Sequence, residues 1–252
     1  MGREAGGPAE IRSVGRALDL LEILQRNAPA GIRVRDAATQ LNVDPATASR
    51  LLSTFIAHGY ASRLANRRYM LGARSLRLAT TWVDRLIQSA APHMAHVAAS
   101  CGETVYLLQL VGSEAVTLAR LAGNRRAMID VEIGPSYPLW ASAAGRALLS
   151  GVPTVFRPAL LPTEPFPALT LRTKTKWAEL AAALQDGRRD GVYVEEGEID
   201  AHLSCYATPL LHRNRDEKLA IAISFETQRS ESDRQMMRQA LRRQWPDFVK
   251  QI

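Results

Sequence analysis

The chain lacks several features that would place it outside the ordinary globular proteins. It has two cysteines in 252 residues, Cys101 and Cys205, too few for a disulfide framework. No apolar run approaches the roughly 18 residues that a membrane-spanning helix needs. The first residues also lack the apolar segment of a secretory signal. We therefore expect a cytoplasmic protein that does not enter a membrane and is long enough for two domains.

Patterns typical of common catalytic sites are missing as well. The sequence has neither a G-x-S-x-G frame nor a glycine-rich loop for phosphate. His202, Cys205 and His212, with Glu198 and Asp200, carry atoms able to bind a metal, but H-x-x-C spacing is a weak signal. We predict no catalytic residue, no metal site and no cofactor. An enzyme or a metal-dependent sensor using the C-terminal part stays open as the alternative.

Positive charge is concentrated in the first third of the chain. The formal net charge is +7, and residues 1–80 hold twelve arginines and no lysine against six acidic residues, which places +6 there. Such a segment suits a polyanion such as DNA. A solvated basic surface is the alternative explanation.

A helix with clear start and stop signals lies within this basic third. Asp44 stands at the N-cap position, Pro45 is the first helical residue, and Gly59 is suited to end the helix. A shorter helix is predicted at residues 35–41, so three residues separate the two, which is typical of a helix-turn-helix. Two short strands around a turn near residues 65–66 add a wing. The sequence therefore predicts a winged helix-turn-helix.

The first helix of this domain is predicted to start after Ser13, which serves as its cap. The apolar stripe predicted for it consists of Val14, Ala17, Leu18, Leu21 and Leu24.

The exposed face of the predicted recognition helix carries short side chains and one arginine. Arginine is the commonest specific donor to guanine in the major groove, and arginines of the wing and the first helix suit phosphates or the minor groove. The residues predicted to contact DNA are Arg16, Thr47, Ser49, Arg50, Ser53, Arg63, Arg67 and Arg68. An ordinary three-helix domain that binds protein is the alternative.

The pattern changes twice after residue 72. Apolar residues at helical spacing over residues 73–90 predict a linker helix, which pairs with another helix or packs on its own domain. Beyond Pro92, apolar β-branched runs alternate with helical stretches, and the proline-rich stretch 152–169 is predicted to be an ordered loop. Strands are predicted at residues 104–111, 115–120, 127–133, 191–194, 205–212 and 219–225. Helices are predicted at residues 91–100, 142–149, 176–189 and 231–244. The fold class is α+β with a mainly antiparallel sheet.

These stretches together resemble the IclR family of bacterial transcriptional regulators. The resemblance is carried by "SVGRALDLLEIL", "DPATASRLLSTFIAHGYASRLANRRYMLG", "GETVYLLQLVG", "IGPSYPLWASAAGRALLSG" and "LSCYATPLLHRNRDEKLAIAISF", in the family's order. It implies a flexible tail (1–10), a winged helix-turn-helix (11–72), a linker and dimerisation helix (73–90) and a GAF-like effector-binding domain (91–252). The implied protein is a homodimer or tetramer that binds a double-stranded DNA operator, as repressor, activator or both. Two departures are Arg35 beside Asp36, where the family usually has a capping Ser or Thr, and "HRNRDEK" in place of a "DG" turn.

The resemblance also implies a site for a small-molecule effector. The residues that match it are Tyr137, Ala143, Ala144, Leu203, Cys205, Ala222 and Ser224. Trp140 lies beside them in sequence, where it either stacks on a ring or belongs to the core, and Glu195 falls where some relatives have an acidic group. Backbone N–H groups around residues 142–144 open a helix and suit a carboxylate. We therefore expect a compact aromatic or organic acid as the effector.

Overall fold

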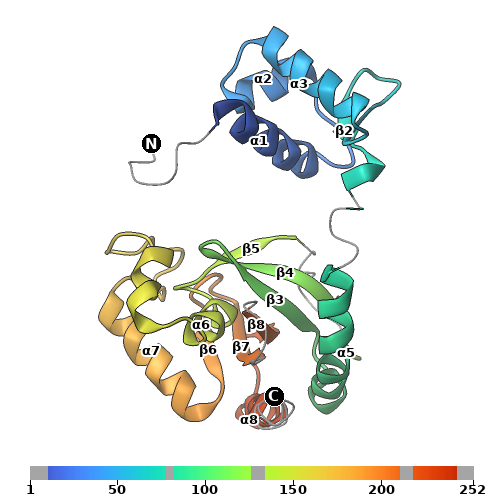
Figure 1. Ribbon diagram of the computed structural model, residues 1–252. Coiled ribbons are helices and arrows are strands. Elements are labelled where there is room, and N and C mark those ends of the chain that lie inside the picture. The colour runs from blue at the N-terminus through green and yellow to red at the C-terminus, as the bar shows by residue number, and fades with distance from the viewer. Residues whose placement is uncertain (1–10, 76, 78–81, 126–133, 211–217, 243–252) are drawn as a thin grey trace. The chain divides into compact units, whose positions relative to one another are not determined.

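The computed structural model describes residues 11–75, 77, 82–125, 134–210 and 218–242, in two compact units divided between Asp84 and Arg85 (Figure 1). Within this described part, no helix is both long and apolar enough to cross a bilayer.

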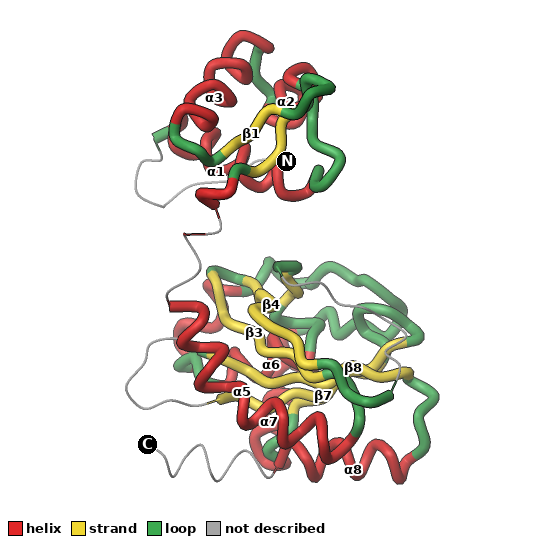
Figure 2. The backbone as a smooth tube through the Cα atoms, turned by 90° about the vertical axis from the view of Figure 1, so that its right-hand side faces the viewer, coloured by secondary structure: helices red, strands yellow, loops and turns green. Residues whose placement is uncertain are grey.

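The N-terminal unit consists of three helices and a two-stranded antiparallel ribbon (Figure 2). Its elements are α1 (Arg12–Arg26), α2 (Val34–Leu41), α3 (Pro45–Ala57), β1 (Ala61–Arg63), β2 (Tyr69–Leu71) and a 3-10 turn, η1 (Ala73–Ser75). Leu20, Leu24, Leu52 and Phe55 meet in one buried core. The predicted winged helix-turn-helix is confirmed.

One prediction for α1 is wrong in two respects. The helix begins at Arg12 with Ile11 at the N-cap, so Ser13 lies inside it and does not cap. Of the predicted stripe, Ala17, Leu21 and Leu24 contact the core, whereas Val14 and Leu18 are 52% and 57% exposed. Leu20 and Ile23, which were not predicted, are buried. The helix carries more apolar residues than one face can bury, and only the face that packs against α2 and β2 is removed from water. Tertiary packing therefore decides which apolar stripe becomes core.

The C-terminal unit is built on a six-stranded antiparallel sheet in the order β5-β4-β3-β8-β7-β6. Its strands are β3 (Val105–Val111), β4 (Glu114–Leu121), β5 (Ser136–Pro138), β6 (Tyr193–Glu196), β7 (Leu203–Leu210) and β8 (Leu219–Glu226). Its helices are α5 (Trp82–Cys101), α6 (Ala143–Ser150), α7 (Trp177–Asp190) and α8 (Glu231–Arg242), with a 3-10 segment, η2 (Thr154–Leu160). The predicted α+β fold with an antiparallel sheet is confirmed.

The two faces of the sheet are covered by different helices. Side chains of α5 and α8 pack with Ile221 and Ile223 on one face, whereas α6 and α7 pack with Ala220 and Ala222 on the other. Successive residues of β8 therefore alternate between a face lined by isoleucine and a face lined by alanine. The small alanines leave room for the start of α6, where the candidate site lies.

Helix α5 differs from the prediction of two helices separated near Pro92. It runs unbroken through Pro92, although an internal proline costs about 3 kcal/mol. The residues that explain this form one buried stripe along its whole described length: Leu86, Ala90, Met94, Val97 and Cys101. Burial of this stripe against the sheet outweighs the lost backbone hydrogen bond. Five residues of the predicted linker helix, 76 and 78–81, lie outside the described residues, and its first three residues form the 3-10 turn η1.

Three smaller differences concern the sheet and its loops. The edge strand β5 was not predicted, because only three residues form it. Seven residues of the proline-rich stretch form η2 instead of an irregular loop. The strand predicted at residues 127–133 lies outside the described residues.

Candidate functional site

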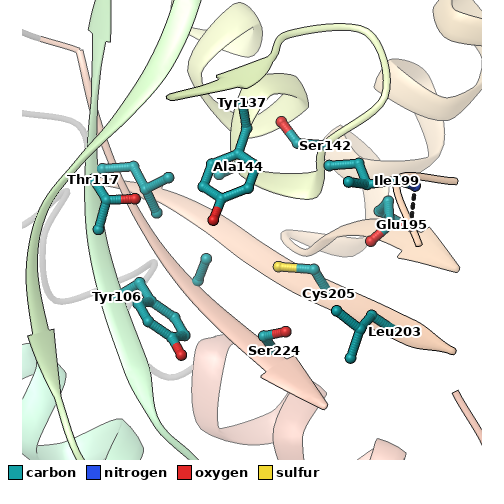
Figure 3. A pocket seen from close by; sticks show the side chains of 12 residues that line it. Tyr106, Thr117, Tyr137, Ser142, Ala144, Glu195, Ile199, Leu203, Cys205 and Ser224 are labelled. Atoms are coloured by element: carbon teal, nitrogen blue, oxygen red, sulfur yellow. Dashed lines mark hydrogen bonds between the residues drawn. The ribbon is translucent and has the colours of Figure 1, made fainter. Parts of the chain in front are cut away.

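A cavity of about 120 Å³ lies between the sheet and the start of α6 (Figure 3). All six strands of the sheet, the start of α6 and the loop after β6 contribute to its wall. Its lining residues are Tyr106, Leu108, Thr117, Tyr137, Ser142, Ala144, Glu195, Ile199, Leu203, Cys205, Ala222 and Ser224. The wall is mainly apolar with a few polar groups, which is the composition of a small-molecule site.

The first turn of α6 is held close to the cavity by a side-chain cap. Ser142 Oγ accepts a hydrogen bond from the Gly145 N–H at 2.9 Å and donates one to the Pro138 carbonyl at 2.8 Å. Residue 145 must be glycine-sized, because a Cβ there would lie 2.5 Å from the Cα of Leu139. The positive end of the helix dipole therefore lies beside the cavity, at Ser142 and Ala144.

Glu195 brings a carboxyl group into this wall from β6. It is 3% exposed, and its Oε1 accepts hydrogen bonds from the backbone N–H groups of Glu198 and Ile199, the latter at 3.3 Å (Figure 3). Burial disfavours the ionised form and raises the pKa of Glu195 to about 7, although the two N–H groups act in the opposite direction. This carboxyl group therefore changes charge near neutral pH.

An ion pair with almost no exposure joins α6 to the loop after β6. Arg146 and Glu198 are 0% and 2% exposed, and Lys174 Nζ lies 2.6 Å from the other oxygen of Glu198. Burial raises the pKa of Glu198, but the hydrogen bond and charge of Arg146 outweigh it, so the pKa lies below its usual value. Arg146 also donates to the carbonyls of Trp140 and Val194. All three nitrogens of this guanidinium thus donate hydrogen bonds inside the protein.

The N-terminal unit presents a second candidate surface on α3. Asp44 accepts from the Thr47 N–H at 2.9 Å and from its hydroxyl at 2.6 Å, and Arg50 Nη2 donates to the same hydroxyl at 3.3 Å. These hydrogen bonds with Thr47 lower the pKa of Asp44. Ser49 and Ser53 are exposed on the same helix. The chain of contacts holds the Arg50 guanidinium toward the start of α3, the part of a recognition helix that reads bases.

The arginines predicted to contact the DNA backbone differ in exposure and in their contacts within the protein. Arg67 is exposed at the turn with φ of 63°, and Arg63 is exposed with its guanidinium 5.8 Å from the ring centre of Tyr69. Arg68 is half-buried and donates to the Gly31 carbonyl at 2.8 Å, which ties the wing to the loop before α2. Arg16 is exposed on α1. Three of these four arginines are therefore exposed, and Arg68 is held by the Gly31 carbonyl.

Two family models cover the two units of this chain. The IclR helix-turn-helix domain matches residues 13–65, and the model described as "Bacterial transcriptional regulator IclR C-terminal" matches residues 79–247. The chain belongs to the IclR family. IclR proteins are transcriptional regulators and not enzymes, so the prediction that this chain is not an enzyme is confirmed, and nothing favours the enzyme alternative. This chain is therefore an IclR-type regulator with a DNA-binding domain and an effector-binding domain.

Other IclR-family proteins resemble the chain over most of its length. It is 30% identical over 220 residues to the HTH-type transcriptional regulator Rv1719 of Mycobacterium tuberculosis, covering 87% of this chain and 84% of that protein. It is 25% identical over 236 residues to the transcriptional repressor IclR of Escherichia coli, covering 91% and 85%. The crystal structure of an IclR homolog from Microbacterium hydrocarbonoxydans, complexed with 4-hydroxybenzoate, shares the fold with a TM-score of 0.78 at 24% identity, covering 94% and 99%.

Six of the eight residues predicted for the IclR effector site line the cavity: Tyr137, Ala144, Leu203, Cys205, Ala222 and Ser224. Ala143 is fully buried and does not line it. Trp140 lines a separate surface groove, where its indole N–H donates to the Pro167 carbonyl at 3.2 Å. Its ring therefore packs outside the cavity.

Four residues that line the cavity were not predicted from the sequence: Tyr106, Leu108, Thr117 and Ile199. Glu195 and Ser142 were noticed only through a loose match and a helix start. Tyr106 and Leu108 alternate along β3 with residues of the opposite core, so alternation was the available signal for them. Thr117 carries a buried hydroxyl with no hydrogen-bond partner among the described residues, a property that only the folded chain reveals.

Among the described residues, no three His, Cys, Asp or Glu side chains lie close enough together to bind one metal ion. Burial raises the pKa of the Cys205 thiol, so this cysteine is a neutral wall residue. His212 lies outside the described residues.

Proposed function

We propose that this IclR-type regulator changes its affinity for a double-stranded DNA operator when a compact aromatic or organic acid occupies the C-terminal cavity. The observation that carries the proposal is the cavity itself, an apolar space that contains a buried Thr117 hydroxyl lacking a partner among the described residues. Buried polar groups are normally hydrogen-bonded, so this hydroxyl supports a ligand with a polar atom.

The size of the cavity limits the ligand. Its volume is about 120 Å³, and an apolar cavity of roughly 150 Å³ is known to take benzene. This volume limits the ligand to a single ring, and the start of α6 offers N–H groups to a carboxylate substituent. The relative that binds 4-hydroxybenzoate holds a single-ring acid, which agrees with this size class.

On the DNA side, we propose base contacts from Thr47, Ser49, Arg50 and Ser53. Contacts to the DNA backbone would come from Arg16, Arg63, Arg67 and Arg68. One N–H of the Arg68 guanidinium donates to the Gly31 carbonyl, so Arg68 would bind a phosphate through its other N–H groups. Helix-turn-helix proteins read paired half-sites as dimers, so a homodimer or tetramer is the expected active form.

The test uses the full chain. Operators are first selected from a random double-stranded DNA pool, and a panel of single-ring acids is screened by thermal shift. Each ligand that stabilises the protein is then added to a fluorescence-anisotropy titration of the selected operator. The proposal expects a change in operator affinity of about 5- to 150-fold. Stabilising ligands that leave operator affinity unchanged would contradict it.

A further inference from the structure

The cavity holds one carboxyl group and no cationic side chain. Among its lining residues Glu195 is the only acid, and no lysine, arginine or histidine belongs to the described wall. Arg146 favours the ionised form of Glu195 through its charge, but its guanidinium donates to Glu198 and to the carbonyls of Trp140 and Val194. A ligand that carries a negative charge would therefore meet Glu195 without a compensating positive side chain.

The two oxygens of Glu195 differ in their surroundings. Oε1 accepts from the N–H groups of Glu198 and Ile199, whereas Oε2 accepts no hydrogen bond from the described residues. Glu195 pairs with Cys205 across β6 and β7, and both side chains lie at the cavity in Figure 3. The carboxyl group is thus anchored by one oxygen and offers the other to a ligand.

Few charges act on this group. Glu198, in the loop after β6, opposes its ionisation, and Arg146 of α6 favours it weakly. The other titratable groups that face it are the Cys205 thiol of β7 and the phenols Tyr137 of β5 and Tyr106 of β3. Burial raises the pKa of Tyr137 and of Cys205, so neither contributes a charge near neutral pH.

We propose that Glu195 determines the chemistry of the effector: it requires a hydrogen-bond donor opposite Oε2, so an anionic ring acid enters this cavity only when Glu195 is protonated. Where Glu195 is ionised in the free protein, it takes up one proton from water on binding, and its O–H then donates to the carboxylate of the ligand. The inference rests on the proposed function, because it concerns the same effector cavity.

The place of Glu195 in the cavity wall makes the proton necessary. Glu195 lines this cavity of about 120 Å³, and no cationic side chain is among its lining residues. A ligand carboxylate about 6 Å from an ionised Glu195 would bind about a hundredfold more weakly at an effective dielectric of about 20. Protonation of one of two close carboxyl groups removes this repulsion, as in paired carboxylates elsewhere.

A neutral ligand that donates a hydrogen bond can bind without protonation of Glu195. The hydroxyl of phenol donates to Glu195 in its ionised form, and Thr117 supplies a further hydroxyl with no partner among the described residues. Phenol and benzoate share a ring of suitable size and differ in charge. They are therefore the matched pair of probes for this cavity.

Isothermal titration calorimetry of the full chain with benzoate and phenol, at pH 6.0, 7.5 and 8.5 in buffers of different ionisation enthalpy, measures affinity and proton uptake together. For benzoate we expect affinity to fall close to tenfold between pH 7.5 and 8.5, with uptake approaching one proton at pH 8.5. For phenol we expect an affinity that does not fall over this range, with no uptake.

The decisive variant is Glu195→Gln, because its amide oxygen retains the two backbone hydrogen bonds and its NH₂ replaces the O–H donor. Benzoate should then bind without proton uptake, equally well at all three pH values and at least tenfold tighter than wild type at pH 8.5. The control is Glu196→Gln, on the same strand, whose carboxylate pairs with Arg234 at 2.7 Å outside the cavity; it should behave as wild type.

The possible failures separate the two proposals. Benzoate binding with no proton uptake and no pH dependence in wild type would overturn the role of Glu195 and leave the effector proposal standing. Failure of both benzoate and phenol to bind at millimolar concentration would overturn the single-ring effector proposed above, and this inference with it.

Discussion

Arg146 and Glu198 form an ion pair that water hardly reaches, with side chains 0% and 2% exposed. The arginine belongs to α6 and the glutamate to the loop between β6 and β7. The start of α6 and this loop supply Ser142 and Ile199 to the wall of the C-terminal cavity. The pair therefore holds together two sides of the cavity while contributing no side chain to its lining.

Removal of one partner should destabilise the C-terminal unit strongly. Arg146→Met leaves Glu198 buried with only Lys174 as a cation, and we expect a loss of about 3 kcal/mol in the free energy of unfolding. Urea denaturation followed by tryptophan fluorescence measures it. The control is Arg189→Met, which removes an exposed pair with Asp186 and should cost less than about 1 kcal/mol. Equal losses for the two variants would contradict this account.

The stability of the protein should fall as the pH rises from about 4.5 to 7, through Glu195. Its pKa is raised to about 7 in the folded chain, so the folded state binds more protons than the unfolded state in this window. The free-energy cost of ionising the buried Glu195 is absent below pH 4.5 and fully present above pH 7. Glu195→Gln should therefore exceed wild type by about 2–3 kcal/mol at pH 8 and match it near pH 4.5. Urea denaturation at both pH values tests this, and an equal difference at both would refute it.

The cap of the recognition helix should matter to the N-terminal unit. Asp44→Ala removes two hydrogen bonds to Thr47, and we expect the melting temperature of this unit to drop by a few degrees. Circular dichroism melting of the full chain records it. Asp36→Ala serves as the control, because Asp36 is exposed in the first turn of α2 and caps nothing. A drop of the same size in both variants would show that the cap is not the cause.

Arg50 and Arg67 should affect DNA binding differently. Arg50→Ala is expected to relax base preference at the contacted position by about 1–3 kcal/mol, since arginine reads guanine directly. Arg67→Ala should weaken all sequences to a similar degree and reduce the salt dependence by about one phosphate contact. Anisotropy titrations against the selected operator, its point variants and an unrelated duplex at several salt concentrations distinguish the two. Unchanged affinity and preference in Arg50→Ala would place the reading face elsewhere.

Part of the cavity was predictable, because its residues fall in stretches that resemble the IclR family. Leu203, Cys205, Ala222 and Ser224 lie on β7 and β8, whose apolar runs are evident in the sequence. Thr117 was not predictable, because the register of β4 against β3 shifts between Leu107 and Leu108. An irregularity of this kind changes which side chains face the cavity, and no local pattern announces it.

The local features of this protein follow from the sequence alone. Asp44, Pro45 and Gly59 set the bounds of α3 because caps and backbone preferences act within one turn of the chain. The continuation of α5 through Pro92 depends instead on tertiary packing, because burial against the sheet outweighs the local cost of proline. Tertiary packing also decided the protonation of Glu195. Burial is the largest cause of its raised pKa, and the cavity wall that contains Glu195 is assembled from β3, β5 and β7, which are far apart in sequence.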